Sequence, residues 1–237
     1  MEVTEASGAG WHHQHRDVSG GKLRPIVFGA VDGLVTNGSL IAGVGGGGLA
    51  RSALILTGLA GLVAGAVSMA TGEYISVANQ NELVAAEAAV ERDRHARYPE
   101  IELAELTEVL VGYGAEPAAA AHVAEAINRD PETALRFHMR EELGVDPSAL
   151  PSPLTAGVAS LVSCALGGLV PLLPLLLGSR SLALVLGIVA VALFLGGEAV
   201  GRVTGRRAFV SGVRQLALGT LAVGVAYGIG RVAGSVV

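Results

Sequence analysis

Residues 154–177 read LTAGVASLVSCALGGLVPLLPLLL, a run of 24 residues without one charged side chain. About 18 apolar residues are enough for a helix to cross the hydrocarbon core of a bilayer. Four further apolar stretches cover residues 26–49, 53–77, 182–200 and 208–230. All are continuously apolar and lack the alternation of barrel strands. The sequence therefore predicts an all-α membrane protein with five transmembrane helices, the third of them kinked or broken by Gly167, Gly168, Pro171 and Pro174.

The composition of the whole chain supports this fold class. Of its 237 residues, 51% are hydrophobic and only 16% are charged, which excludes a disordered chain and an ordinary soluble protein. The single cysteine, Cys164, lies within an apolar run, so an internal disulfide is impossible and we expect this side chain only to pack.

Charge is divided sharply along the chain. Residues 79–150 hold 6 Arg against 15 Asp or Glu, a balance of −9, whereas the remainder holds 10 basic and 6 acidic residues, a balance of +4. An acidic block between apolar blocks predicts a soluble insert that attracts cations and repels nucleic acid. Proline and glycine signals predict helices over 79–97, continuing the second span, and over 100–111, 117–127 and 130–143.

Basic residues near the span ends predict the orientation. Arg16, Lys22, Arg24, Arg202, Arg206 and Arg207 lie on one side, and Arg51, Arg180 and Arg231 on the other. The positive-inside tendency places the first side in the cytoplasm and the carboxyl terminus outside. We therefore divide the chain into a cytoplasmic tail (1–24), the first two spans (25–78), a cytoplasmic metal-binding insert (79–150) and the last three spans (151–237).

Ionisable groups inside spans are the first candidate site. Asp32 lies in the first span, where an acid costs about 2.5 to 3.5 kcal/mol on insertion scales, so we expect it to face a cation or a water-filled cavity. A structural hydrogen-bonding role is the alternative. Met69 and Glu73 share one face of the second span, and a thioether beside a carboxylate suits a borderline transition metal. Simple packing is the alternative for Met69.

The insert offers a second candidate site. His138 and Glu142 share a helix face and Met139 adjoins them, a mixture that can bind a divalent first-row metal. A solvated acidic surface is the alternative. A cluster of His12, His13 and His15 in the tail is a weaker metal or proton site.

With these motifs the sequence resembles the vacuolar iron transporter family. The resemblance rests on residues 28–36 (FGAVDGLVT), 65–74 (GAVSMATGEY) and 167–174 (GGLVPLLP) together with the acidic insert, and it covers about 23–230. It implies a homodimer of five-span protomers that exchanges Fe(II), and often Mn(II), for protons, along a path at the dimer interface between the first two spans.

The resemblance also implies ligands for the transport path. Asp32 and Met69 match the family's aspartate and methionine there. A glutamate that plant members carry before that methionine falls on Gly61, so we expect Glu73 to substitute for it from the other side of Met69.

In the insert, the family's metal-binding positions are occupied here by Glu91, Glu102, Glu105, Met139 and Glu142. His138 stands where plant members have a second methionine, and Arg94 where they have another glutamate. Histidine is an acceptable ligand and arginine is not. We therefore expect fewer bound ions than in a plant relative, or a cluster rearranged around Glu87 or Glu141.

These observations predict a proton-coupled exporter of Fe(II), and of Mn(II) or another divalent first-row metal, that protects the cytoplasm from free metal without an organic cofactor. A membrane-tethered iron buffer or sensor is the alternative. An enzyme is disfavoured, because no nucleophile with its base and no paired Glu-x-x-His motif is present. The 15 Arg against 1 Lys, with many Ala and Gly, suggest a bacterial cell membrane as the location.

Overall fold

The computed structural model describes residues 23–236, so the histidines of the amino-terminal tail lie outside the described part. Within that range every regular element is helical. The elements are α1 (Leu23–Gly46), α2 (Arg51–Arg97), α3 (Pro99–Gly112), α4 (Pro117–Asn128), α5 (Pro131–Leu143), α6 (Pro153–Leu169), η1 (Val170–Leu172), α7 (Leu173–Leu176), α8 (Leu182–Val203) and α9 (Ala208–Ala233). Five helical stretches are long and apolar enough to cross a bilayer, which confirms the predicted all-α fold with five such helices.

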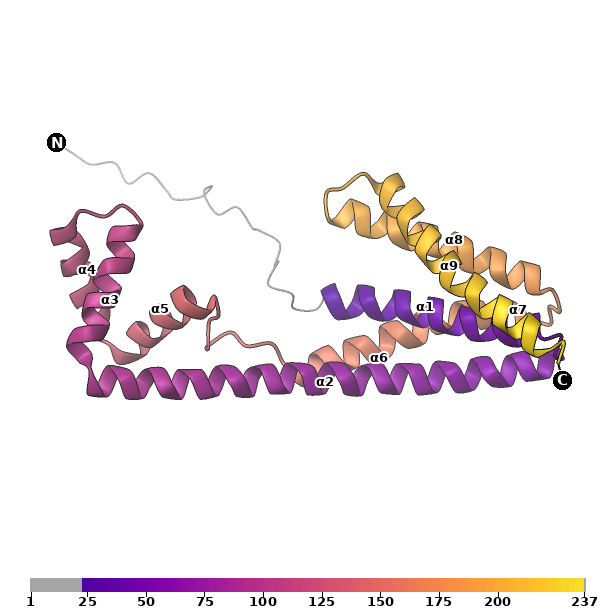
Figure 1. Cartoon of the computed structure of the whole chain (residues 1–237), viewed down its shortest axis with the longest axis horizontal. Helices are drawn as coiled ribbons and strands as arrows, with labels where there is room; N and C mark the ends of the chain where they lie inside the picture. The colour runs from indigo at the N-terminus through magenta and orange to yellow at the C-terminus, as the bar shows by residue number, and fades with distance from the viewer. Residues whose placement is uncertain (1–22, 237) are drawn as a thin grey trace, which may run out of the picture.

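Helix α2 connects the two halves of the molecule. It is a single helix of 47 residues, about 70 Å long at 1.5 Å per residue, and it runs along the whole molecule beneath both the spans and the insert (Figure 1). The absence of Gly and Pro from residues 73–97 lets the second span continue outward, as predicted. The helix ends at Arg97, because Pro99 disfavours helical backbone at Tyr98.

The third span is broken, as its prolines predict. Helix α6 ends at Leu169, a 3-10 turn follows, and α7 completes the segment. Pro171 and Pro174 have no backbone N–H and cannot continue the regular ladder. The Arg51 guanidinium donates two hydrogen bonds, of 2.9 and 2.6 Å, to the Leu175 carbonyl, so the start of α2 holds the end of this broken span.

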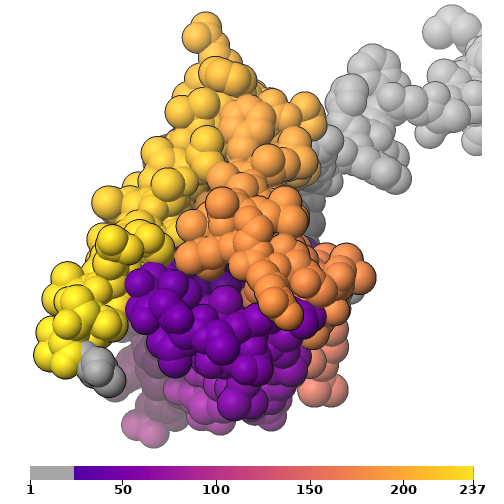
Figure 2. Space-filling view, turned by 90° about the vertical axis from the view of Figure 1, so that its right-hand side faces the viewer, coloured from indigo at the N-terminus to yellow at the C-terminus, as the bar shows by residue number. Residues whose placement is uncertain are grey.

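Helix α1 is the centre of the span bundle, packed against α2, α6, α8 and α9. Viewed from the end where α1 and α2 are joined, α9 (yellow) and the start of α8 (orange) lie over the violet α1–α2 pair (Figure 2). Glycine permits the closest approach: a Cβ on Gly33 would collide with the Cys164 carbonyl, and one on Gly167 with the Ala30 carbonyl. The backbones of α1 and α6 therefore touch at the level of Asp32.

The insert folds onto the outer half of α2. Val84 and Ala88 of α2 pack with Leu135 and Met139 of α5 in a small buried cluster. Helix α5 begins where the Asp130 side chain accepts a hydrogen bond from the Thr133 amide (3.2 Å), and it ends at Gly144 with φ +66°. The helices predicted for the insert are all present, with ends within a few residues of those expected.

Candidate metal centre

Acidic and imidazole side chains from three helices converge in the insert. Glu91 and His95 lie one turn apart on α2, close to its end. The turn at Tyr98 folds α3 back so that Glu102 faces them, and α5 brings His138 from the other side. Glu105 of α3 and Glu142 of α5 stand at the more exposed edge of the same cluster. We call these six residues the insert cluster.

The spacing within the insert cluster suits a single small cation. His138 Nδ1 lies 3.6 Å from Glu91 Oε1, 3.8 Å from Glu102 Oε2 and 3.6 Å from Glu142 Oε1. His95 Nε2 lies 3.5 Å from Glu91 Oε1, and the two imidazole rings meet edge to face at 4.7 Å. Two ligands of one ion with bonds of about 2.1 Å lie no more than about 4.2 Å apart. These atoms could close around an ion with small side-chain movements.

Burial makes the cluster's donor atoms costly to leave unpaired. The Glu102 side chain is fully buried and that of Glu91 is 8% exposed. Within residues 23–236, Glu91 Oε1, both Glu102 carboxylate oxygens, His95 Nε2 and His138 Nε2 have no hydrogen-bond partner. A buried carboxylate without hydrogen bonds is strongly disfavoured unless a cation compensates it. The chemistry of this donor set, carboxylate oxygen with imidazole nitrogen, matches a first-row divalent metal.

Arg94 supplies part of that compensation. Its guanidinium lies 3.0 Å from Glu102 Oε1 and 3.3 Å from Glu105 Oε2. The Glu102 contact is an ion pair without hydrogen-bond alignment, so Arg94 contributes charge more than a directed bond. The neighbouring carboxylates, Glu102 first, raise the pKa of Arg94, so it remains a cation. Arg94 therefore acts as the counter-ion of Glu102 and Glu105.

The electrostatics of the cluster favour a proton on one acid when no metal is bound. Burial, followed by repulsion from Glu142 and Glu102, raises the pKa of Glu91 to about 7. Burial and the neighbouring His138 lower the pKa of His95, so its imidazole stays neutral and free to bind a metal at neutral pH. Near pH 7 the cluster can therefore exchange a proton for a metal ion.

The structure brings some of the ligands predicted for the insert together and leaves others outside the insert cluster. Glu91, Glu102, Glu105, His138 and Glu142 come together. Met139 is 2% exposed and packs in the apolar layer beside them. Glu87 is exposed and lies one turn before Glu91, and Glu141 accepts a 2.6 Å hydrogen bond from the Tyr113 hydroxyl, so neither joins the cluster.

His95 is the residue that sequence reasoning missed. It follows Glu91 by four positions, so the two side chains share a helix face, and this spacing was visible in the sequence. No pattern in the sequence, however, predicted that α5 would pack against this face of α2.

In the span bundle, Asp32 lines a narrow cavity between α1, α2 and α6. The cavity has about 10 Å³ of space, close to the smallest volume that holds one water molecule. Asp32 is half-buried, and its Oδ1 is 3.5 Å from the Thr36 hydroxyl. Within residues 23–236 it forms no ion pair, so its carboxylate is open to a cation.

Met69 and Glu73 lie further along α2 and do not line this cavity. Gly61 and Gly65 of α2 line it, and Met69 follows Gly65 by one helical turn and Glu73 by two. Both side chains are half-buried, and in the described part of the chain Glu73 forms no ion pair. A single protomer therefore does not assemble Asp32, Met69 and Glu73 into one ligand shell.

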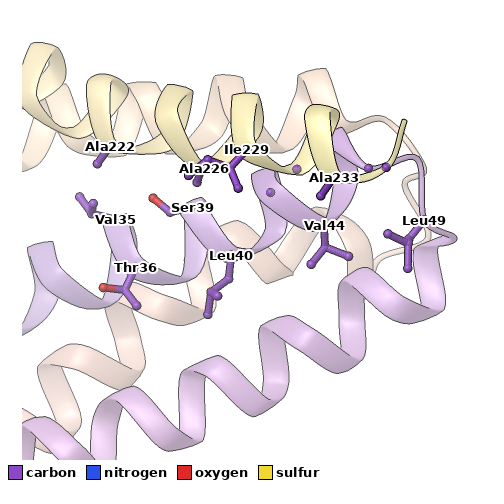
Figure 3. Close-up of a pocket in the computed structure, with 14 residues that line it drawn as sticks. Val35, Thr36, Ser39, Leu40, Val44, Leu49, Ala222, Ala226, Ile229 and Ala233 are labelled. Carbon is purple, nitrogen blue, oxygen red and sulfur yellow. The ribbon is translucent and has the colours of Figure 1, made fainter. Parts of the chain in front are cut away.

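A larger groove of about 900 Å³ lies between α1 and α9 and is drawn in Figure 3. Val35 and Ile229 point into it, and the polar side chains labelled there are the hydroxyls of Thr36 and Ser39. Among the described residues it is lined by no carboxylate or imidazole, the side chains that bind first-row metals most readily.

The chain is similar to known proteins over most of its length. The model of the VIT family matches residues 23–231. A protein of Oryza sativa subsp. japonica named Vacuolar iron transporter 1 is 34% identical over 230 residues, which are 95% of this chain and 91% of the relative. Its namesake in Arabidopsis thaliana is 32% identical over 225 residues, 93% of this chain and 90% of the relative. Both similarities extend through the spans and the insert alike.

Proposed function

The chain belongs to the VIT family and is a multi-pass membrane protein, and on this premise we propose that it exports Fe(II), and Mn(II) as a second substrate, from the cytoplasm in exchange for protons. The observation that carries the proposal is the insert cluster, a buried set of carboxylates and imidazoles at the end of the same helix that forms the second span. The relatives of similar length that are named vacuolar iron transporters support Fe(II) as the transported metal. Moving an ion needs no covalent chemistry, which fits a transporter and not an enzyme.

The insert would act as the capture site. Its negative balance raises the local concentration of cations, and the carboxylates of Glu91 and Glu102 with the imidazoles of His95 and His138 replace part of the water shell of the metal. Because Glu91 holds a proton up to about pH 7, capture releases that proton on the cytoplasmic side. Helix α2 then leads from the capture site to the spans.

Asp32 would bind the ion within the bundle, with Met69 and Glu73 as further ligands on α2. A carboxylate must be deprotonated to hold a metal, so a proton arriving at Asp32 from outside would release the ion there. Since one protomer keeps Met69 and Glu73 apart from the Asp32 cavity, we propose that a homodimer completes the site. A partner covering the exposed α2 face would also remove the Glu73 carboxylate from lipid.

We propose that the insert and the tail face the cytoplasm. The start of α1 and the connection between α8 and α9 lie at the end of the bundle nearer the insert (Figure 1), and that connection holds Arg206 and Arg207. This basic end supports the positive-inside orientation. The excess of Arg over Lys supports a bacterial cell membrane as the location.

Asp32→Asn tests the transport proposal. We expect reconstituted vesicles with the wild type to take up Fe(II) under an imposed pH gradient, and vesicles with Asp32→Asn to take up less than about a tenth as much, because the neutral amide cannot exchange a proton for the ion. Asp93→Asn is the matched control, since Asp93 is an exposed acid whose one ion pair within residues 23–236 is with Arg97 at 2.9 Å. Equal uptake by the wild type and Asp32→Asn would reject Asp32 as part of the path. A wild type that binds Fe(II) but moves none would make the tethered buffer the better account.

A further inference from the structure

Asn37 is a polar side chain sealed inside the span bundle. It lies in the middle of α1 and is 1% exposed. Its Nδ2 donates a hydrogen bond of 2.5 Å to the Gly168 carbonyl of α6. A carbonyl can only accept, so this contact fixes which end of the carboxamide is nitrogen and turns the oxygen away from Gly168.

The Asn37 oxygen has no hydrogen-bond partner among residues 23–236. It faces α2 where a glycine leaves room: a Cβ built on Gly61 would lie 3.1 Å from Asn37 Oδ1. Asn37, Gly61 and Asp32 all line the same narrow cavity. An unpaired amide oxygen in an apolar setting is costly, whereas a cation beside it would offset that cost. Amide oxygens are ordinary ligands of divalent cations.

We propose that the Asn37 carboxamide oxygen is a second oxygen ligand of the transport site, beside Asp32, and that it takes the role of the glutamate that plant members carry at the position of Gly61. This inference rests on the proposed transport function. The two positions are neighbours in space although they lie on different helices, so an oxygen supplied from α1 reaches the volume that a side chain from α2 would otherwise fill.

An amide oxygen from Asn37 in place of a glutamate carboxylate at position 61 changes the charge of the site. Asp32 is the only carboxylate among the residues that line the cavity, and the Asn37 oxygen is neutral. One carboxylate then binds the ion where a glutamate at position 61 would provide a second.

A purely structural Asn37 is the competing interpretation, because its amide nitrogen joins α1 to α6. The two roles differ at position 61. A structural role would not be restored by a carboxylate on α2, since a carboxylate has no hydrogen to donate to the Gly168 carbonyl. A ligand role would be restored, since a side chain at position 61 starts 3.1 Å from the place of the Asn37 oxygen, and, with Asn37 shortened to Ala, its Cβ meets only the end of the flexible Leu40 side chain.

Fe(II) uptake into proteoliposomes containing the full chain tests this proposal. We expect Asn37→Ala to raise the half-saturating Fe(II) concentration about tenfold or more, and the double variant Asn37→Ala/Gly61→Glu to return it towards the wild-type value. Ser160→Ala is the matched control: Ser160 is also 1% exposed with an unpaired oxygen, but it lies outside the cavity, so uptake should not change. An unchanged Asn37→Ala, or a loss that Gly61→Glu does not reverse, would overturn the proposal.

A second pair of variants covers the case in which Asn37→Ala does not fold. With Asn37 intact, Gly61→Glu should lower the half-saturating Fe(II) concentration relative to Gly61→Gln, which has the same size without the charge. Identical behaviour of the two would contradict a ligand site beside Asn37. If the wild type itself moves no Fe(II), the proposed function fails, and this result is distinct from either outcome for Asn37.

Discussion

His95 illustrates what a single residue adds to the insert cluster. Its ring meets that of His138 at 4.7 Å, and its Nε2 lies 3.5 Å from the carboxylate of Glu91. Because burial lowers the pKa of His95 and keeps its imidazole neutral, its lone pair is available at neutral pH. Two imidazoles beside two buried carboxylates shift the donor set towards nitrogen, which suits a transition metal better than Ca²⁺ or Mg²⁺.

Replacing this ring should weaken metal binding. We expect His95→Ala to lower the affinity of the full chain for Mn(II) by at least about tenfold, measured by titration calorimetry in detergent. His122→Ala is the matched control, because His122 is an exposed histidine of α4 outside the cluster. The same affinity in both variants would show that His95 is only a neighbour of the metal.

At the scale of helices, local signals in the sequence predicted most elements. Pro99, Pro117 and Pro131 each open a helix at its first position, and Gly144 ends one in left-handed backbone. These signals act within one or two turns and do not depend on the rest of the fold. The extension of α2 was predictable for the same reason, since its outer half contains no residue that breaks a helix.

Contacts between helices were not predictable in the same way. His95 enters the cluster only because α5 packs on that face of α2, and Asn37 is buried only because α6 approaches α1 through Gly33 and Gly167. Periodicity gives the face of a helix but not its neighbour. Spacing on one helix indicated His138 and Glu142, and the resemblance to the family added Glu91, Glu102 and Glu105, whereas neither one pointed to His95.

The insert as a unit should bind metal more weakly in acid. Glu91 has a pKa of about 7, so below that pH a metal must displace its proton, and above it the carboxylate is already free. One such proton predicts a roughly tenfold weaker affinity at pH 6 than at pH 8. Calorimetry with Mn(II) at both values checks this, and Glu91→Gln should bind more weakly at pH 8 and flatten the difference. Equal wild-type affinities would mean that the metal does not contact Glu91.

At the scale of the whole molecule, the bundle leaves much of α2 uncovered. Only 17% of the most apolar part of its span is buried, and Val63 and Val67 are more than half exposed. Lipid can cover apolar side chains, but it is a poor environment for the Glu73 carboxylate on the same helix. This uncovered face is where we place the second copy of the homodimer.

Cysteine crosslinking tests that placement. Ser68 is exposed on α2, and the native Cys164 is buried, so Ser68→Cys in a Cys164→Ala background adds one accessible thiol among residues 23–236. We expect mild oxidation in native membranes to yield a covalent dimer. Leu218→Cys, at a position 64% exposed on α9, should remain monomeric under the same conditions. Crosslinking through position 218 but not 68 would move the interface to α9.

The central claim is that metal and protons move in opposite directions, and simultaneous recording of both fluxes tests it most directly. Wild-type proteoliposomes would hold a metal-sensitive dye and a pH dye, with Fe(II) kept reduced and supplied outside. An acidic lumen should accelerate Fe(II) entry through protein whose insert faces outward, and the luminal pH should rise as the metal enters. Fe(II) entry that is equally fast without the gradient, and that leaves the luminal pH unchanged, would contradict proton-coupled export.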